Sequence, residues 1–187
     1  MGSDPELMER YCAGDKRAFY ELYDKLAPAL LRYLQNLTRD RARAEDLLQT
    51  TFLKLHQNRS AYVSGAAPKP WLFAIAHRTF IDEYRRSRTS RKHADAIAAR
   101  EERAHITGVR ESDAPEPTYD PALAEQAMAA LKHLPPKQRE AVELTKLEGL
   151  STEEAAQVAG TSRGAIKQRV HRGYETMRAA MTKEDER

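Results

Sequence analysis

The sequence predicts an all-α protein made of two small helical domains joined by a flexible linker. Apolar residues recur at spacings of three and four in almost every ordered stretch, and no run alternates Val, Ile or Thr as a strand would. Two basic stretches are separated by an acidic stretch that contains prolines. The length of 187 residues suits one ordinary domain or two small ones.

The overall composition excludes several classes of protein. Mean hydropathy is −0.74, and no stretch approaches the ~20 apolar residues that cross a bilayer. Residues 1–6 lack the basic start and apolar run of a secretory signal, so we expect a cytoplasmic protein without membrane insertion. Cys12 is the only cysteine, which excludes an intramolecular disulfide and a cysteine-based zinc site. We expect no metal and no cofactor.

The distribution of charge indicates two modules that face nucleic acid. Residues 68–92 contain seven basic and two acidic side chains, and residues 161–183 contain six basic and one acidic. Residues 111–125 contain five acidic side chains and no Lys or Arg. We therefore expect domains at 1–92 and 121–187 with a linker at 93–120. The alternative for each basic stretch is an ordinary solvated helix face.

The first domain is predicted to contain helices that bury apolar stripes. Asp4 and Pro5 suit an N-cap and first turn, and Asp15 opens a second helix. That helix carries a stripe that other helices must bury: Phe19, Leu22, Tyr23, Leu26, Leu30, Tyr33, Leu34 and Leu37. After a polar break at 38–43, a second stripe follows: Leu47, Leu48, Thr51, Phe52 and Leu55. Residues 58–69 lack a period and predict a loop, and Pro70 starts an Arg-rich third helix.

The second half of the chain predicts a tether and then shorter helices. Residues 90–119 have few large apolar side chains and suit a flexible tether, with room for a helical piece at 93–103. The helical period returns at Pro121 and breaks at Pro135–Pro136. A helix is expected over 138–147. Ser151 and Glu154 then form a capping box that opens a short helix.

The short capped helix, a turn at Gly160 and a longer basic helix to about Met181 form a helix-turn-helix pattern. Packing between the two helices should involve Ala155, Val158, Ile166 and Val170. The outward face then carries Arg163, Lys167, Gln168, His171 and Arg172. Arg and Lys donate to guanine edges and Gln pairs with adenine, so this face suits a major groove. The alternative is a plain helical hairpin with a solvated basic face.

Residues 44–52, AEDLLQTTF, resemble a motif of the bacterial sigma factors of the extracytoplasmic-function group, group 4 of the sigma-70 family. In that family this helix docks on the clamp helices of the β′ subunit of RNA polymerase core. The resemblance implies polymerase contacts at Asp46, Leu48, Gln49 and Phe52. The apolar stripe alone would instead place Phe52 in the core, and both interpretations stay open at this stage.

Residues 70–76 and 81–86 resemble the part of the family that binds and opens the promoter −10 element. Opening DNA requires a pocket or stacking surface for an unpaired base and cations for the single strand. Tyr62 and the polar loop 58–64 suit the pocket, and Trp71 suits either base stacking or the core. The candidate cations are Arg78, Arg85, Arg86 and Arg88. Family members usually carry Asn where this sequence has Arg78.

Residues 134–141 and 148–156 resemble the family's second domain, whose helix-turn-helix recognises the −35 element. The combined resemblance implies a dissociable subunit that binds RNA polymerase core and directs promoter-specific initiation. It implies promoter DNA and an anti-sigma factor as further partners. The DNA-recognition residues expected here are the five outward side chains of the last helix.

The alternative function is that of a stand-alone helix-turn-helix regulator. Such a protein would bind duplex DNA through the C-terminal module and use its N-terminal helices to dimerise or to sense a ligand. An enzyme is not expected, because the six His residues are scattered and no His-Glu-x-x-His, Gly-rich phosphate loop or Gly-x-Ser-x-Gly is present.

Overall fold

The computed structural model describes residues 2–94 and 121–185, and every regular element in these ranges is a helix or helical turn, which confirms the all-α class. The elements are α1 (Asp4–Cys12), α2 (Lys16–Thr38), α3 (Arg41–Asn58), the 3-10 turn η1 (Arg59–Ala61), α4 (Pro68–Ala94), α5 (Pro121–His133), α6 (Pro136–Val142), the π-helical turn η2 (Glu143–Leu147), α7 (Thr152–Val158) and α8 (Arg163–Asp185). The expected linker lies almost wholly outside the described residues, as does most of the helical piece expected at 93–103.

The helix boundaries follow the predicted caps, with two corrections at helix starts. Ser3, not Asp4, is the N-cap of α1, and its N–H donates to the Glu6 carboxylate at 2.8 Å. Helix α4 begins at Pro68, not at Pro70. Both prolines fit in the first turn, because the first N–H groups of a helix have no partner within it.

The last helices also differ in detail from the sequence pattern. The stretch expected as one helix over 138–147 begins at Pro136 as α6 and ends as the π-helical turn η2. Helix α8 continues beyond Met181 to Asp185. Neither difference changes the order of the helices.

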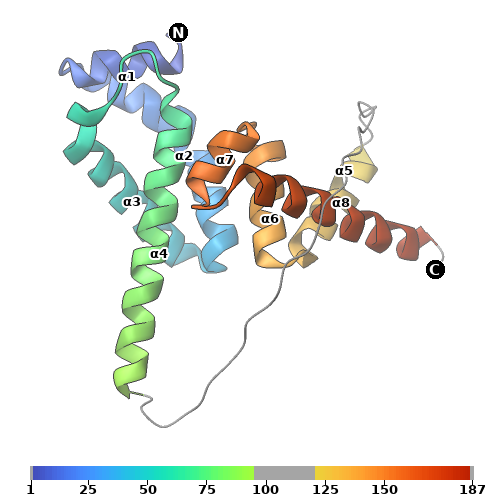
Figure 1. Cartoon of the computed structure of the whole chain (residues 1–187). Coiled ribbons are helices and arrows are strands. Elements are labelled where there is room, and N and C mark those ends of the chain that lie inside the picture. The colour runs from blue at the N-terminus through green and yellow to red at the C-terminus, as the bar shows by residue number, and fades with distance from the viewer. Residues whose placement is uncertain (1, 95–120, 186–187) are drawn as a thin grey trace.

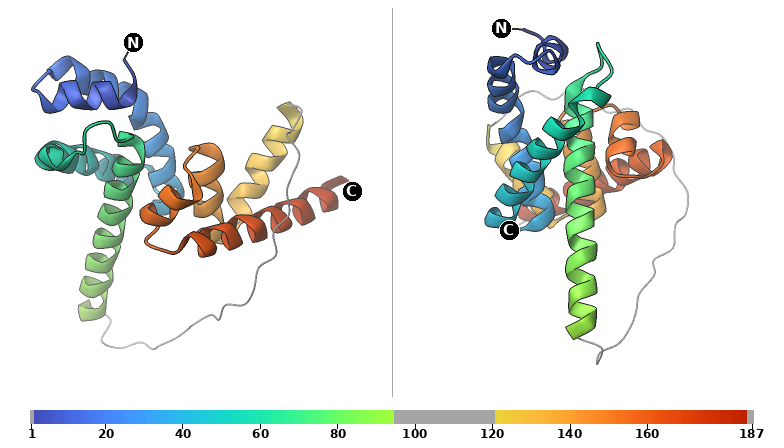
Figure 2. Two further views of the ribbon diagram at one scale, coloured as in Figure 1. Left: turned by 45° about the horizontal axis from the view of Figure 1, so that its top comes forward. Right: turned by 90° about the vertical axis from the view of Figure 1, so that its left-hand side faces the viewer.

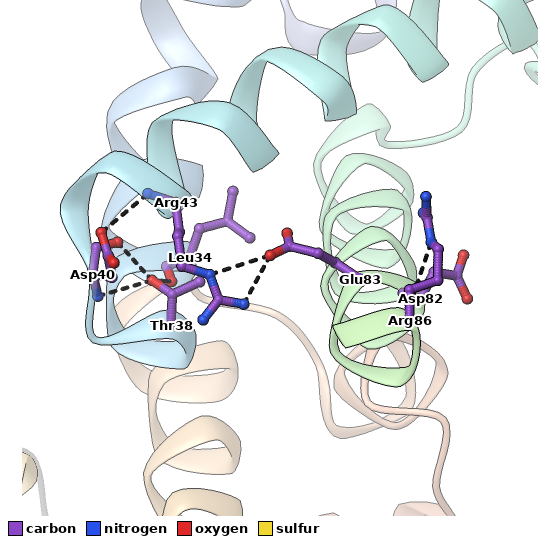
Figure 3. Close-up of polar contacts among 7 residues, drawn as sticks. All are labelled: Leu34, Thr38, Asp40, Arg43, Asp82, Glu83 and Arg86. Carbon is purple, nitrogen blue, oxygen red and sulfur yellow. Dashed lines mark hydrogen bonds and ion pairs between the residues drawn. The ribbon is translucent and has the colours of Figure 1, made fainter. Parts of the chain in front are cut away.

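Helices α1–α4 form the N-terminal domain around a buried apolar core. Helix α2 packs against α1, α3 and α4, and α3 packs against α4. An ion pair joins α3 to α4, where Arg43 Nη2 lies 2.8 Å from Glu83 Oε1 (Figure 3). Asp40 lies in the short turn between α2 and α3 and is the N-cap of α3, where its side chain accepts from the Arg43 N–H at 3.1 Å. The last turns of α4 extend beyond the helices packed on its first half (Figure 1).

Helices α5–α8 form the C-terminal domain. Helix α8 packs against α5, α6 and α7. A small apolar cluster fills the space between α5, α6 and α8, and its buried members are Ala130, Leu131, Leu134, Val142 and Met177. The remaining apolar residues of α7 and the first part of α8 face the N-terminal domain rather than this cluster.

The two domains share one continuous core, an arrangement that the sequence left open. Helix α7 packs against α4 and α6 contacts α2, and Figure 2 shows the C-terminal helices beside the N-terminal domain in both views. The same buried cluster contains Phe73 and Ala76 of α4 together with Leu144, Ala155 and Ile166 of the C-terminal domain. The described helices therefore pack as one body.

Three buried carboxylates cross the contact between the domains. The Tyr33 hydroxyl donates to Glu140 Oε1 at 2.9 Å, and His77 Nδ1 lies 2.9 Å from the same oxygen. Burial and the adjacent Glu140 carboxylate raise the pKa of the Tyr33 hydroxyl well above its ordinary value. Asn36 Nδ2 donates to Glu143 Oε1 at 2.7 Å.

The third carboxylate, Glu148, pairs with cations of both N-terminal helices that face it. Arg32 Nη2 and Lys69 Nζ each lie 3.0 Å from one of its oxygens, and Lys69 also donates to the Glu148 carbonyl at 2.6 Å. Because buried charges are costly unless they are paired, these contacts allow only one register of the two domains.

Glu143 makes this contact sensitive to pH. The pKa of its carboxyl is raised from 4.5 to about 7, and burial is the largest cause. The neighbouring carboxylates Glu140 and Glu148 contribute to this rise, while Arg139 and the hydrogen bond from Asn36 oppose it. The unfolded chain releases this proton at a lower pH than the folded chain does. The stability that the neutral carboxyl contributes is therefore fully present below about pH 4.5 and is lost as the pH rises to about 7.

Glu143→Gln should remove most of that pH dependence. Gln keeps an oxygen for Asn36 but cannot ionise, so the variant should exceed the parent in unfolding free energy by up to about 3 kcal/mol at pH 8, with little difference at pH 5. Denaturant unfolding from pH 5 to 8 measures this. Glu153→Gln, at an exposed position in α7, is the control, and parallel pH profiles for all three proteins would contradict the assignment.

Gly173→Ala and Gly164→Ala should change stability in opposite directions. A Cβ at Gly173 would lie 2.9 Å from Val142 Cγ2 and 3.4 Å from Leu134 Cδ1, whereas nothing lies within 4 Å of one at Gly164. We expect Gly173→Ala to lower the unfolding free energy by about 1–2 kcal/mol through overpacking. Gly164→Ala should raise it by up to about 1 kcal/mol. Thermal and denaturant unfolding test both, and two changes of the same sign would show that the packing of α6 on α8 is misassigned.

Candidate functional site

The four predicted polymerase-binding residues of α3 differ in the exposure of their side chains. The side chains of Asp46 and Gln49 are exposed. Leu48 and Phe52 are buried, with exposed fractions of 6% and 5%. The Phe52 ring lies 4.6 Å from the ring of Tyr23 and belongs to the core. The core interpretation of Phe52 is therefore favoured, and of the four residues only Asp46 and Gln49 have exposed side chains.

The apolar periodicity does not identify three large exposed side chains of α2 and α3. Tyr23 was expected within the buried stripe, yet 37% of it is exposed. Tyr20 of α2 and Leu53 of α3 are more exposed still. Tyr23 lies at the edge of its stripe, where its ring contacts the rings of Phe19 and Phe52 while part of the side chain stays exposed. Large exposed apolar side chains of this kind are typical of protein interfaces.

A cavity of about 290 Å³ lies where η1, α3 and α4 meet. Its lining consists of Lys54, Asn58, Ala61, Trp71, Ile75, Arg78 and Asp82. The structure thus brings Trp71 and Arg78 together, as predicted for the −10 site, and adds Lys54 and Asp82, which the sequence argument did not single out. Lys54 lies on α3 and Asp82 on α4, and the packing of these two helices brings both residues to the cavity.

The predicted pocket residue Tyr62 lies beside this cavity rather than in its lining. Its ring centroid lies 5.9 Å from that of Trp71. Trp71 itself is half-buried against the core and also lines the cavity, so its position is compatible with both of its predicted roles. An aromatic wall next to an amide, a carboxylate and cations can stack on a planar base and hydrogen-bond to its edge.

The predicted cations continue from the cavity along α4. The side chains of Arg78, Arg85 and Arg86 are exposed, and Arg86 Nε donates to the Asp82 carbonyl at 3.3 Å (Figure 3). Arg88 lies in the same helix, but its side chain falls outside the described residues. Helix α4 therefore carries positive charge onto the segment that extends beyond the rest of the fold (Figure 1).

The helix-turn-helix has the predicted geometry. Ser151 and Glu154 form the capping box of α7, and Gly160 adopts φ +58 in the turn, a conformation that glycine accepts at little cost. Ser162 accepts from the Ala165 N–H at 3.1 Å at the start of α8. The four predicted contact residues pack together, three fully buried and Val170 partly: Ala155, Val158, Ile166 and Val170.

The outer face of α8 carries all five predicted DNA-recognition residues. Arg163, Lys167 and Arg172 are exposed, whereas Gln168 and His171 are half-buried. His171 Nε2 lies 3.4 Å from a Glu175 oxygen one turn along the helix. The main helix contacts between the domains are those of α7 with α4 and of α6 with α2, and Arg163, Lys167 and Arg172 stay exposed beside them.

Within the described ranges, no group of three or more His, Cys, Asp and Glu side chains is placed to hold a metal ion. The helices of these ranges are all too short or too polar to cross a bilayer.

Comparison with known proteins places both domains in one family. Residues 22–90 match Sigma-70 region 2, and residues 124–177 match Sigma-70, region 4. The chain is 42% identical over 171 residues to the RNA polymerase sigma factor CarQ of Myxococcus xanthus, which covers 91% of this chain and 93% of CarQ. It is 32% identical to the ECF RNA polymerase sigma factor SigF of Caulobacter vibrioides, covering 96% and 94% of the two chains.

The fold agrees with these matches. The sigma factor RpoE from Bartonella quintana, solved in complex with the anti-sigma factor NepR, superposes with a TM-score of 0.64 at 27% identity. The superposition covers 88% of this chain and 96% of RpoE. By sequence and by fold, the chain belongs to the extracytoplasmic-function group of the sigma-70 family of RNA polymerase sigma factors.

Proposed function

We propose that this sigma factor joins RNA polymerase core to promoters through three separate surfaces, and that it performs no covalent chemistry and needs no cofactor. The main observation in support is that one chain combines three features: an exposed polar face on α3, a base-sized cavity beside Trp71 and an exposed helix-turn-helix face. A stand-alone regulator would need only the last of these. The family matches in both domains support the same choice.

The polymerase surface would be centred on Asp46 and Gln49. Their side chains are exposed on α3, while Leu48 and Phe52 hold that helix against the core. The partner would be the clamp helices of the β′ subunit. Leu48 and Phe52 then act by positioning the contacts rather than by making them.

The promoter would be recognised at two elements. The cavity beside Trp71 would hold an unpaired −10 base, with Arg78 in its lining and Arg85, Arg86 and Arg88 of α4 along the strand backbone. The outer face of α8 would enter the major groove at the −35 element. The complex of the sigma factor RpoE from Bartonella quintana with the anti-sigma factor NepR supports a sequestering partner for this chain as well. The cytoplasm, where polymerase works, would be its compartment.

The direct test uses purified bacterial core RNA polymerase. The full chain should bind core in a pull-down and should produce promoter-selective transcripts in run-off transcription on fragments of its own genome. A folded, inhibitor-free protein that does not bind core, but binds a palindrome as a dimer, would favour the stand-alone regulator instead.

Asp46→Ala combined with Gln49→Ala should weaken binding to core polymerase by at least about tenfold. Both side chains are exposed, so the unfolding free energy should change by less than about 1 kcal/mol. Gln157→Ala, at an exposed position in α7, provides an amide control that should bind normally. Titration of labelled protein with core polymerase measures the affinity, and a large loss of stability would return these residues to a structural role.

Lys167→Ala or Arg172→Ala should weaken binding of the holoenzyme to promoters that carry the −35 element by about five- to a hundredfold, because each removes a contact to a base edge or phosphate. Core polymerase binding should be unchanged. Lys132→Ala, which removes an exposed cation from α5, is the charge-matched control. Loss of core binding rather than promoter binding would show that the C-terminal module has been misassigned.

A further inference from the structure

We propose that helix α1 positions the loop beside the −10 cavity, and that the Glu9 carboxylate is the residue through which it acts. The loop comprises residues 62–67, between η1 and α4. This inference rests on the −10 function proposed above. Helix α1 lies before residues 22–90, the part that matches Sigma-70 region 2, so the family match assigns it no role.

One oxygen of Glu9 holds the tip of the loop. Its Oε1 accepts from the Gly65 backbone N–H at 2.9 Å and also from the Ser64 hydroxyl. Two donors on one carboxylate oxygen fix both the height and the orientation of the tip relative to α1. Bonds of this charge-assisted kind are stronger than bonds between neutral groups.

The loop needs such an anchor, because little else in the fold holds its tip. Val63, Ser64 and Gly65 are exposed, and Gly65 adopts φ +79. The remaining bonds lie within the loop, where the Ala66 N–H donates to the Val63 carbonyl at 3.1 Å. Such bonds set the shape of a turn but not its place on the protein. Each backbone residue that must be ordered on binding costs about 1–2 kcal/mol, so an unanchored loop would lose affinity for its ligand.

Helix α1 is a rigid support for this contact. Leu7 and Met8 are buried in the core. The Tyr11 hydroxyl lies 2.6 Å from His56 Nδ1, and Cys12 Sγ donates to the Arg59 carbonyl at 3.3 Å. Helix α1 is therefore tied to the end of α3 and to η1, the segments that lead into the loop.

The loop in turn is coupled to the cavity wall. The Tyr62 hydroxyl donates to the Ala66 carbonyl, which closes the loop. The Tyr62 ring lies 5.9 Å from the ring of Trp71, which lines the cavity. A shift of the loop tip would move Tyr62 and change the support of Trp71. Glu9 thus acts through other residues and is a positioning residue that does not touch the base.

A measurement of base discrimination distinguishes a positioning role of Glu9 from a general electrostatic effect of its charge on DNA binding. A carboxylate near DNA repels phosphates, so its removal raises affinity for every sequence alike. The ratio of affinities for the preferred base and for another base at the same position cancels that general effect. A loosened cavity lowers the ratio, whereas a change of charge alone leaves it constant.

The experiment compares holoenzymes assembled from core polymerase and full-length parent, Glu9→Ala, Glu9→Gln or Glu21→Gln. Glu21 is an exposed carboxylate of α2 and serves as the matched control. Each holoenzyme is titrated with single-stranded oligonucleotides that carry the −10 element with each of the four bases at the captured position. Binding to core polymerase, the melting temperature and hydrogen exchange at the Gly65 amide are measured in parallel.

We expect Glu9→Ala to lower the discrimination ratio by about three- to tenfold, as the loss of one or two modest hydrogen bonds would, and to speed exchange at Gly65. Glu9→Gln keeps an acceptor oxygen and should restore most of the ratio. Glu21→Gln should match the parent, and core binding should be equal in all four.

Three results would overturn the inference. An unchanged ratio in Glu9→Ala, with a parent that discriminates normally, removes the role of Glu9 and leaves the proposed function intact. A fall in core binding and melting temperature in place of the ratio would make α1 a purely structural helix. A parent holoenzyme with no base preference would overturn the −10 function together with this inference.

Discussion

The fold depends on the burial of three carboxylates between two domains that the sequence separates. Glu140, Glu143 and Glu148 come from one short segment of the C-terminal domain, and each meets a donor or cation on α2 or α4. A buried carboxylate without a partner would cost several kcal/mol. The shared apolar core therefore forms only in the register that satisfies all three, which makes the closed arrangement specific rather than a general collapse.

The same groups give the contact a polar part beside the shared apolar core. The carboxylates, Tyr33, Asn36 and Lys69 can all be hydrated when the domains part, whereas Phe73, Leu144 and Ile166 would lose their apolar neighbours. Interfaces between domains are typically more polar than obligate interfaces between proteins. Elements named −10 and −35 lie about 25 base pairs apart, which is about 85 Å at about 3.4 Å per base pair. On the proposed function, domains in direct contact would not reach both elements at once, so promoter binding would require this contact to open.

Local features of the fold could be predicted from the sequence, and long-range contacts could not. Three local features depend only on residues close in sequence, so they can be predicted without knowledge of the long-range contacts. They are the capping box at Ser151, the turn at Gly160 and the outer face of α8. Periodicity identifies an apolar face but not its edge, which explains why Tyr23 is half uncovered. Glu140 and Glu143 look solvated in sequence because their partners Tyr33 and Asn36 each lie 107 positions away. The roles of Lys54 and Asp82 were missed because the cavity forms only when α3 meets α4.

The closed arrangement leaves the surfaces of the proposed function uncovered. Asp46 and Gln49 are exposed on α3, and Arg163, Lys167 and Arg172 are exposed on α8. On that function, closure would prevent simultaneous recognition of both promoter elements without covering the two residues proposed to contact polymerase. Complete inhibition would then need a separate partner that covers α3 or α8, because domain closure leaves both accessible. Sequestration by another protein and opening of the domains would therefore be physically distinct steps, of which the first acts on exposed surfaces and the second on the buried carboxylates.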